Sequence, residues 1–264
     1  MDYQKLCKSL IYQTLSSPQD EFFDKLRHKI DDYFLILPDG SVNTFSNTKN
    51  KNKLKGNLFE YICLGLIKLN IFRQISCKNA WLFSEIPDDL KIFLGFRNKD
   101  MGIDIVVQTT TDTWIAVQCK YKKEPTYKKS PNGHHIRWQV NWKTLSTFYS
   151  LCERTGPQVG VYNDPTKQVG DHADPAKQVG GWYKRVVITT AQSVNRQGHK
   201  NDKDISICIN TFRSINKDIW LKFIGDIGHK CSSHFDVTNI ESIKDKDAID
   251  KEELRLKRLA FYNK

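Results

Sequence analysis

The chain has 264 residues, of which 39% are hydrophobic and 11% aromatic, and its formal net charge is +11. This length and composition suit one sizeable core with an added lobe, and they exclude a disordered tail. The basic excess indicates a polyanionic partner, nucleic acid first and an anionic membrane surface second, although a generally lysine-rich composition would give the same charge.

The cysteines and the N-terminus indicate a reducing compartment. The 7 cysteines are scattered and never form C-x-x-C, which argues against both a zinc finger and a disulfide framework. We therefore expect a cytoplasmic protein, or a nuclear one in a eukaryotic host. The start M-D-Y-Q-K-L-C-K has no signal-peptide core, and no apolar run reaches membrane-spanning length, so we expect no membrane.

The first part of the chain predicts helices. Residues 3–15 and 20–37 have helical apolar spacing, with Ser17 as the cap of the second helix, and 41–53 has the polar composition of a linker. The next helix, 55–70, is apolar on almost all sides except at Glu60. The Glu60 carboxylate either meets a cation or metal, or it reaches the rim and pairs with a lysine.

The segment 101–123 predicts a β-hairpin with polar residues inside it, after an extended stretch at 71–84 and a turn at 87–90. Asp104 interrupts an apolar strand. Gln118 and Lys120 lie two apart on the next strand and leave it on one face, whereas Cys119 points to the other. Burying these polar groups is costly unless they pair or bind metal, so they indicate a site. Cys119 itself fits a packed strand residue better than a nucleophile.

Basic residues follow each of two predicted strands. A lysine cluster comes after the hairpin, and a polar loop lies between strands at 183–190 and 204–209. Both fit phosphate contacts, and the lysine cluster fits a solvated loop nearly as well. The candidate DNA contacts are Lys122, Lys123, Lys128, Lys129, Ser193, Arg196 and Lys200.

The remaining segments complete an α/β fold. Residues 136–153 predict a crossover helix to a parallel strand, and 156–181 predicts a surface insertion with a partial repeat. Helices are expected at 215–225 and 248–262. We predict a central mixed β-sheet flanked by helices. Its parts are an N-terminal helical arm and linker (1–50), a core (51–212) and a C-terminal helical extension (213–264).

If the hairpin packs against the Glu60 helix, two carboxylates and an amide oxygen converge. Hard oxygen ligands of this kind suit Mg²⁺ or Mn²⁺. A metal there would lower the pKa of a bound water, and Lys120 would position that water and offset charge on the phosphorus. The pattern predicts metal-assisted phosphodiester hydrolysis.

The order Glu60, Asp104, Gln118-x-Lys120 resembles the PD-(D/E)XK nuclease superfamily, and Gln118 with G-I-D before it is similar to its Mrr-like restriction endonuclease branch. W-L-F-S-E-I-P at 81–87, W-I-A-V-Q-C-K-Y at 114–121 and V-V-I-T-T-A at 186–191 resemble the N-terminal nuclease domain of large restriction-type helicases. The resemblance covers about 54–212, apart from the insertion.

The resemblance implies a restriction-endonuclease-like core that acts on DNA. It makes Asp104 the principal metal ligand, joined by Gln118, the Cys119 backbone carbonyl and Glu60, with Lys120 as the catalytic lysine. Cutting both strands generally calls for two active sites, so we expect a homodimer. The chain is either a stand-alone nuclease or acts with a helicase, as its partner or as part of a longer polypeptide. The chain departs from the pattern at Ile103, where proline is usual, and at Gln118, which removes one negative charge. No G-x-x-x-x-G-K-[ST] motif follows.

Two alternatives to a metal-dependent DNA endonuclease remain open. The first is a DNA-binding module that keeps the fold but no longer cuts. Asp104 and Lys120 argue against it, whereas Gln118 leaves it open. The second is a nuclease that resolves branched DNA, such as Holliday junctions, with a related site.

Overall fold

The structure, a computed structural model, describes residues 2–33, 48–96, 102–125, 138–157, 181–197 and 201–226. All of these lie in one compact unit that spans Met1–His229. Within the described residues no helix is long and apolar enough to cross a membrane.

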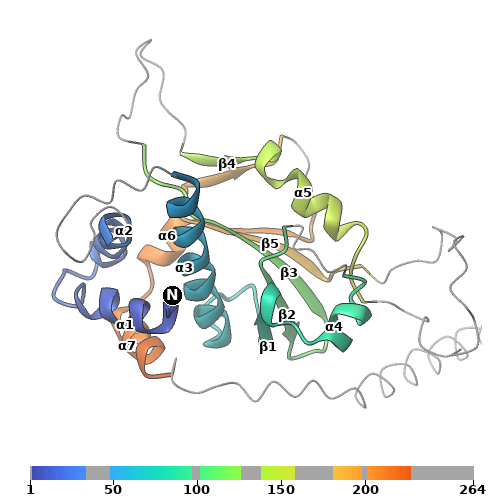
Figure 1. The fold of residues 1–264 in the computed structure, drawn as a ribbon, viewed down its shortest axis with the longest axis horizontal. Coiled ribbons are helices and arrows are strands. Elements are labelled where there is room, and N and C mark those ends of the chain that lie inside the picture. The colour runs from blue at the N-terminus through green and yellow to red at the C-terminus, as the bar shows by residue number, and fades with distance from the viewer. Residues whose placement is uncertain are drawn as a thin grey trace, which may run out of the picture. The chain divides into compact units, whose positions relative to one another are not determined.

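The centre of the fold is a mixed sheet of five strands in the order β1-β2-β3-β5-β7 among the described residues (Figure 1). β1 (Cys77–Leu82), β2 (Ile105–Thr109) and β3 (Trp114–Lys120) are antiparallel neighbours. β5 (Lys184–Thr189) runs parallel to β3, and β7 (Asp204–Ile207) runs parallel to β5. The mixed α/β architecture expected from the sequence is therefore confirmed.

The predicted hairpin is formed by β2 and β3. Every residue of β2 is buried, as are all those of β3 except Lys120, as expected for β-branched strands at the centre of a covered sheet. The turn is closed by a hydrogen bond from the Thr109 N–H to the Thr113 carbonyl, 2.8 Å long. Asp112 has a positive φ of 57°, a conformation that aspartate tolerates better than most residues.

A helix joins the hairpin to the parallel strand, as predicted, but it is shorter than expected. α5 (Trp142–Cys152) begins where the side chain of Asn141 accepts a hydrogen bond from the Thr144 N–H at 3.1 Å. Before it, β4 (Gln139–Asn141) pairs in parallel with β6 (Ser193–Asn195). The prediction of helix through 139–141 and of loop through 193–195 was wrong, because such short strands depend on a distant partner.

One face of the sheet is covered by α3 (Thr48–Lys68), the helix that carries Glu60 (Figure 1). The prediction of a linker at 41–53 was wrong from Thr48 onward. The helix begins at Thr48, seven residues before Lys55, where the sequence predicted its start. Its first turns lack an apolar period, and Lys55 is instead held at 2.6 Å by Asp31 of the N-terminal arm. This buried ion pair stabilises a part of the helix in which the sequence has no apolar spacing.

The helices from both ends of the unit pack beside α3. α1 (Tyr3–Tyr12) and α2 (Phe22–Tyr33) come from the N-terminal arm, and α6 (Ile209–Arg213) and α7 (Lys217–Asp226) follow the sheet. The rings of Phe23 and Phe212 stack with centroids 4.7 Å apart. Gly65 allows α3 to approach α7, since a Cβ there would lie 2.1 Å from the Phe223 ring. Ser17 is too far upstream to cap α2.

The segment between α3 and the hairpin is less extended than predicted. β1 is followed by a 3₁₀ turn at Phe83–Glu85, and the predicted turn at 87–90 leads into α4 (Asp88–Phe93). The predicted repeat-bearing insertion, apart from its edges, and the predicted helix at 248–262 lie outside the described residues.

Candidate active site

Asp104 immediately precedes β2 and is fixed by contacts from β3 and from the 3₁₀ turn that follows β1. Its N–H donates to the Val117 carbonyl at 2.9 Å, and its carbonyl accepts from the Phe83 N–H at 2.9 Å. Its carboxylate oxygen Oδ2 accepts a 2.6 Å hydrogen bond from the Cys119 N–H. The carboxylate therefore lies against the backbone of β3, between the positions of Gln118 and Lys120.

Gln118 is a buried amide with an oxygen that lacks a hydrogen-bond donor. The side chain is 3% exposed, and Oε1 has no partner within the described residues. The other buried side-chain atoms without a partner in that part of the chain are N–H donors of Arg27, Trp138 and Trp220. Such an oxygen costs free energy when buried, unless a cation or a water satisfies it.

Gly102 makes room for the Gln118 amide. Its φ is +113°, and a Cβ there would lie 3.4 Å from Gln118 Nε2 and 3.5 Å from the Phe148 nitrogen of α5. This glycine is the first residue of the G-I-D motif, and the sequence pattern alone predicted no role for it. Its positive φ and its closeness to the amide make it part of the site's geometry.

The Gly102→Ala substitution should disturb both stability and the amide. An alanine at this φ is strained, which we expect to lower the free energy of unfolding by about 1–3 kcal/mol. Gly56→Ala is the control, because no atom of the described residues lies within 4 Å of a Cβ at Gly56 and alanine is favoured in a helix. Urea titration of both variants measures the effect, and equal stability of the two would contradict the argument.

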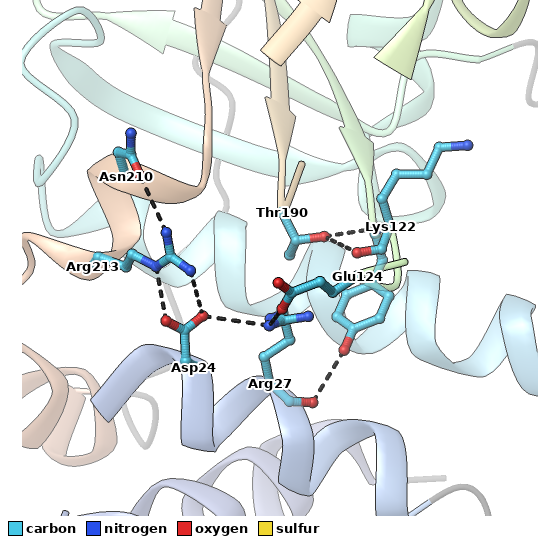
Figure 2. A network of polar contacts seen from close by, with 8 residues as sticks. Asp24, Arg27, Lys122, Glu124, Thr190, Asn210 and Arg213 are labelled. Carbon is cyan, nitrogen blue, oxygen red and sulfur yellow. Dashed lines mark hydrogen bonds and ion pairs between the residues drawn. The ribbon is translucent and has the colours of Figure 1, made fainter. Parts of the chain in front are cut away.

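Lys120 ends β3 and is half-buried. Its backbone is tied to the parallel strand β5, because its carbonyl accepts from Thr189 Oγ1 at 2.7 Å. Two residues later, the Thr190 hydroxyl accepts from the Lys122 N–H at 2.7 Å and donates to the Lys122 carbonyl at 2.9 Å (Figure 2). These two fully buried threonines fix the strand end that carries Lys120. Only the V-V-I-T-T-A pattern pointed to them.

Cys119 faces α3, whereas Gln118 faces Gly102 and α5. The thiols of Cys119 and Cys63 hydrogen-bond to each other, and burial raises the pKa of both. The negative charges of Glu60 and Asp104 raise both pKa values further. A thiol kept protonated in this way is not a nucleophile.

Glu60 and Asp104 therefore lie near the same pair of thiols, but α3, the helix that carries Glu60, covers the face of β3 opposite Gln118. Alternation along the strand puts Cys119 and Gln118 on opposite faces, and α3 covers the Cys119 face. Asp104 thus bonds to β3, the strand that carries Gln118 and Lys120, and it also lies near the thiols that face α3. The structure does not bring Glu60 and Gln118 together on a single face.

The donor set suits a hard divalent ion better than zinc. Among the described residues no three His, Cys, Asp or Glu side chains gather as a metal site. An ion here would combine the Asp104 carboxylate with neutral oxygens, Gln118 Oε1 and a backbone carbonyl. Mg²⁺ and Mn²⁺ accept such sets and complete them with water. The orphaned oxygen of Gln118, one residue before the Cys119 N–H that fixes the Asp104 carboxylate, fits this requirement.

The predicted DNA contacts differ in their surroundings. Lys123 and Ser193 are exposed and Lys122 is half-buried. Arg196 is tied to the protein, since its Nε donates to the Tyr149 hydroxyl at 3.0 Å and its Nη2 to Ser206 Oγ at 2.7 Å. Lys128, Lys129 and Lys200 lie outside the described residues.

Comparison with known proteins identifies the family of the chain. No curated protein matches the chain. Among solved structures, the chain is similar to an ATP-dependent Type ISP restriction-modification enzyme, LlaBIII, bound to DNA, with 17% identity and a TM-score of 0.35. The match covers 61% of this chain and 8% of that one. A family model described as "Restriction endonuclease", of the Mrr catalytic type, matches residues 71–218, more than half of the chain. The chain therefore belongs to this Mrr-like restriction endonuclease family.

Proposed function

We propose that the chain is a Mg²⁺- or Mn²⁺-dependent endonuclease that hydrolyses phosphodiester bonds of DNA. The observation that carries the proposal is the orphaned Gln118 oxygen, buried on β3. Gln118 immediately precedes Cys119, whose N–H holds the Asp104 carboxylate, and it lies two residues before Lys120 on the same face of the strand. Family membership supports a nuclease, and the net charge of +11 supports a polyanionic substrate.

Each residue has a separate role in this proposal. Asp104 and Gln118, with the Cys119 carbonyl, would hold the ion, which when bound supplies a water of lowered pKa and positive charge beside the phosphate. Glu60 would add negative charge from the α3 side, a smaller contribution than that of Asp104. The Lys120 ammonium would orient the attacking water and balance the charge that develops on the phosphoryl oxygens. Lys122 and Lys123 would contact the DNA backbone.

The direct test is cleavage of a supercoiled plasmid by the full chain. We expect nicked and linear products with Mg²⁺ or Mn²⁺ and none with EDTA. Gel shifts in Ca²⁺ at several salt concentrations measure binding alone, which should weaken as salt rises. Salt-sensitive binding without cleavage in any divalent metal would overturn the proposal and favour the non-cleaving module, which the missing charge at Gln118 leaves open.

Gln118→Glu should tighten the metal site. A carboxylate in place of the amide restores one negative charge at a position facing the ion, and ligand charge sets affinity at such sites. We expect the Mg²⁺ concentration for half-maximal cleavage to fall about tenfold, equal to ~1.4 kcal/mol. The measurement is a metal titration of the cleavage rate.

Gln74→Glu is the matched control for that titration. It adds the same charge at an exposed position, and the Gln74 carbonyl binds Lys184 at the start of β5, far along the sheet from Lys120. Its metal dependence should equal that of the wild type. If Gln118→Glu also left the titration unchanged, residue 118 would have no place among the ligands.

A further inference from the structure

The segment that follows Lys120 is held by the N-terminal arm. The Tyr121 hydroxyl donates to the backbone carbonyl of Arg27 in α2 at 3.2 Å, and Glu124 Oε2 accepts from Arg27 Nη2 at 2.6 Å (Figure 2). Arg27 lies 97 residues from Glu124 in sequence and precedes the region that matches the family. An element outside that region therefore contacts the chain immediately after the candidate catalytic lysine.

Arg27 is itself fixed from several sides. Its side chain is 1% exposed and its guanidinium lies over the Trp138 ring, 4.9 Å from the centroid. Asp24, one turn earlier in α2, contacts Arg27 Nη2 at 3.4 Å and is held in turn by two hydrogen bonds from Arg213 of α6. Figure 2 shows Asp24 between the two arginines, with the Glu124 carboxylate directly above the Arg27 guanidinium, and both carboxylates contact the same nitrogen, Nη2.

The burial of Arg27 costs free energy of folding. Arg27 Nε and Nη1 are buried and lack a hydrogen-bond partner within the described residues. Burying a cation with unused donors costs free energy that an apolar side chain of similar size would not. A charge kept at this cost, with its one short bond directed to Glu124, indicates that the position of Glu124 matters.

The strand end is thus clamped from two sides. Thr189, the last residue of β5, and Thr190, which follows it, hold the backbone of Lys120 and Lys122 on one side. Arg27 of α2 holds Tyr121 and Glu124 on the other. The backbone of Lys120 lies between these attachments, so its side chain leaves from a fixed point. Fixing a reacting group to within a fraction of an ångström has a large effect on rate.

We propose that Arg27 is a positioning residue of the nuclease: through Glu124 and Tyr121 it fixes the end of β3 and thereby the Lys120 ammonium. This inference rests on the proposed function. It makes the N-terminal arm a part of the catalytic unit.

The structure offers a matched control in Arg185. This buried arginine at the start of β5 also contacts two carboxylates, those of Glu153 and Asp204, and lies over an aromatic ring, that of Tyr149, 5.1 Å from its centroid. It is at the end of β5 away from Thr189, which pairs with Lys120. Glu124→Gln and Glu153→Gln each remove one charged partner of a buried arginine, but only the first is next to the site.

The experiment compares these two variants with the wild type in single-turnover plasmid cleavage. We expect Glu124→Gln to lower the maximal rate about tenfold, with DNA affinity in Ca²⁺ and the Mg²⁺ requirement unchanged. Glu153→Gln should cleave at the wild-type rate. Tyr121→Phe, which removes the hydroxyl that bonds to the Arg27 carbonyl and also interacts with Asp31 of the same helix, should show a smaller loss in the same direction. Melting temperatures show whether any loss follows stability instead.

A second measurement separates positioning from a general structural role. If Glu124 acts through Lys120, then adding Glu124→Gln to Lys120→Met should cause no further loss of the residual rate. Full additivity, or equal losses in Glu124→Gln and Glu153→Gln, would overturn the positioning role while leaving the nuclease intact. A wild-type chain that never cleaves would instead overturn the proposed function, and the positioning role with it.

Discussion

Lys120→Met should abolish most of the cleavage while leaving the substrate bound. Methionine keeps an unbranched apolar stem of similar reach and removes only the ammonium. Loss of the group that orients the water and balances phosphoryl charge should lower the single-turnover rate roughly 10³-fold. DNA affinity should fall only by the contribution that one lysine–phosphate contact makes to binding. The Mg²⁺ concentration needed for cleavage should be unchanged.

Lys184→Met controls for the loss of a lysine from the same sheet. Lys184 begins β5 and pairs with Ile115, at the end of β3 away from Lys120, and its amine binds the Gln74 carbonyl at 3.1 Å. This variant should cut plasmid at the wild-type rate. Equal cleavage by the Lys120→Met and wild-type proteins would remove Lys120 from the mechanism.

The parts of the fold that local pattern encodes were predictable. The β2–β3 hairpin follows from apolar alternation around a short polar turn, and the parallel placement of β5 follows from the helical spacing of α5. The alternation of Gln118, Cys119 and Lys120 follows from strand geometry alone. These features need no knowledge of distant partners, since neighbouring residues determine them.

The features that were missed depend on pairs that are far apart in sequence. The first turns of α3 are stabilised by Lys55 against Asp31, and β4 exists only because β6 lies beside it. The clamp on the strand end joins Arg27 to Glu124 across 97 residues. No periodicity marks a buried arginine as the partner of a particular glutamate, so the role of the N-terminal arm could not be predicted.

The position of Glu60 shows the same limit within the candidate site. Helical periodicity identifies it as a carboxylate on an otherwise apolar helix, but periodicity does not say which face of β3 that helix covers. The Cys63–Cys119 contact puts α3 on the face opposite Gln118, while the charges of both Glu60 and Asp104 reach those thiols. Asp104, which bonds to the β3 backbone, is therefore the carboxylate that we expect to hold the ion in the proposed function.

Of the substitutions proposed, Asp104→Asn should accordingly lower the cleavage rate most. Asparagine has the same shape, and its amide oxygen can still accept the Cys119 N–H that now donates to Oδ2 at 2.6 Å. The fold should remain, whereas the single full charge on the hairpin face of the metal site is lost. We expect cleavage to fall by more than about 10³-fold and Mn²⁺ binding, followed by calorimetry, to weaken at least about tenfold.

Asp112→Asn shows whether such a loss is specific to the site. Asp112 is in the hairpin turn at the other end of β2 and bonds to Lys78 at 2.7 Å and Gln108 at 3.0 Å. Asparagine tolerates its positive φ of 57°, so the turn should persist and cleavage should be unchanged. If Asp104→Asn bound Mn²⁺ and cut DNA as well as Asp112→Asn does, no ion would be held at this carboxylate. The hydrolytic role of the hairpin would then have to be abandoned, and a fold that binds DNA without cutting it would remain.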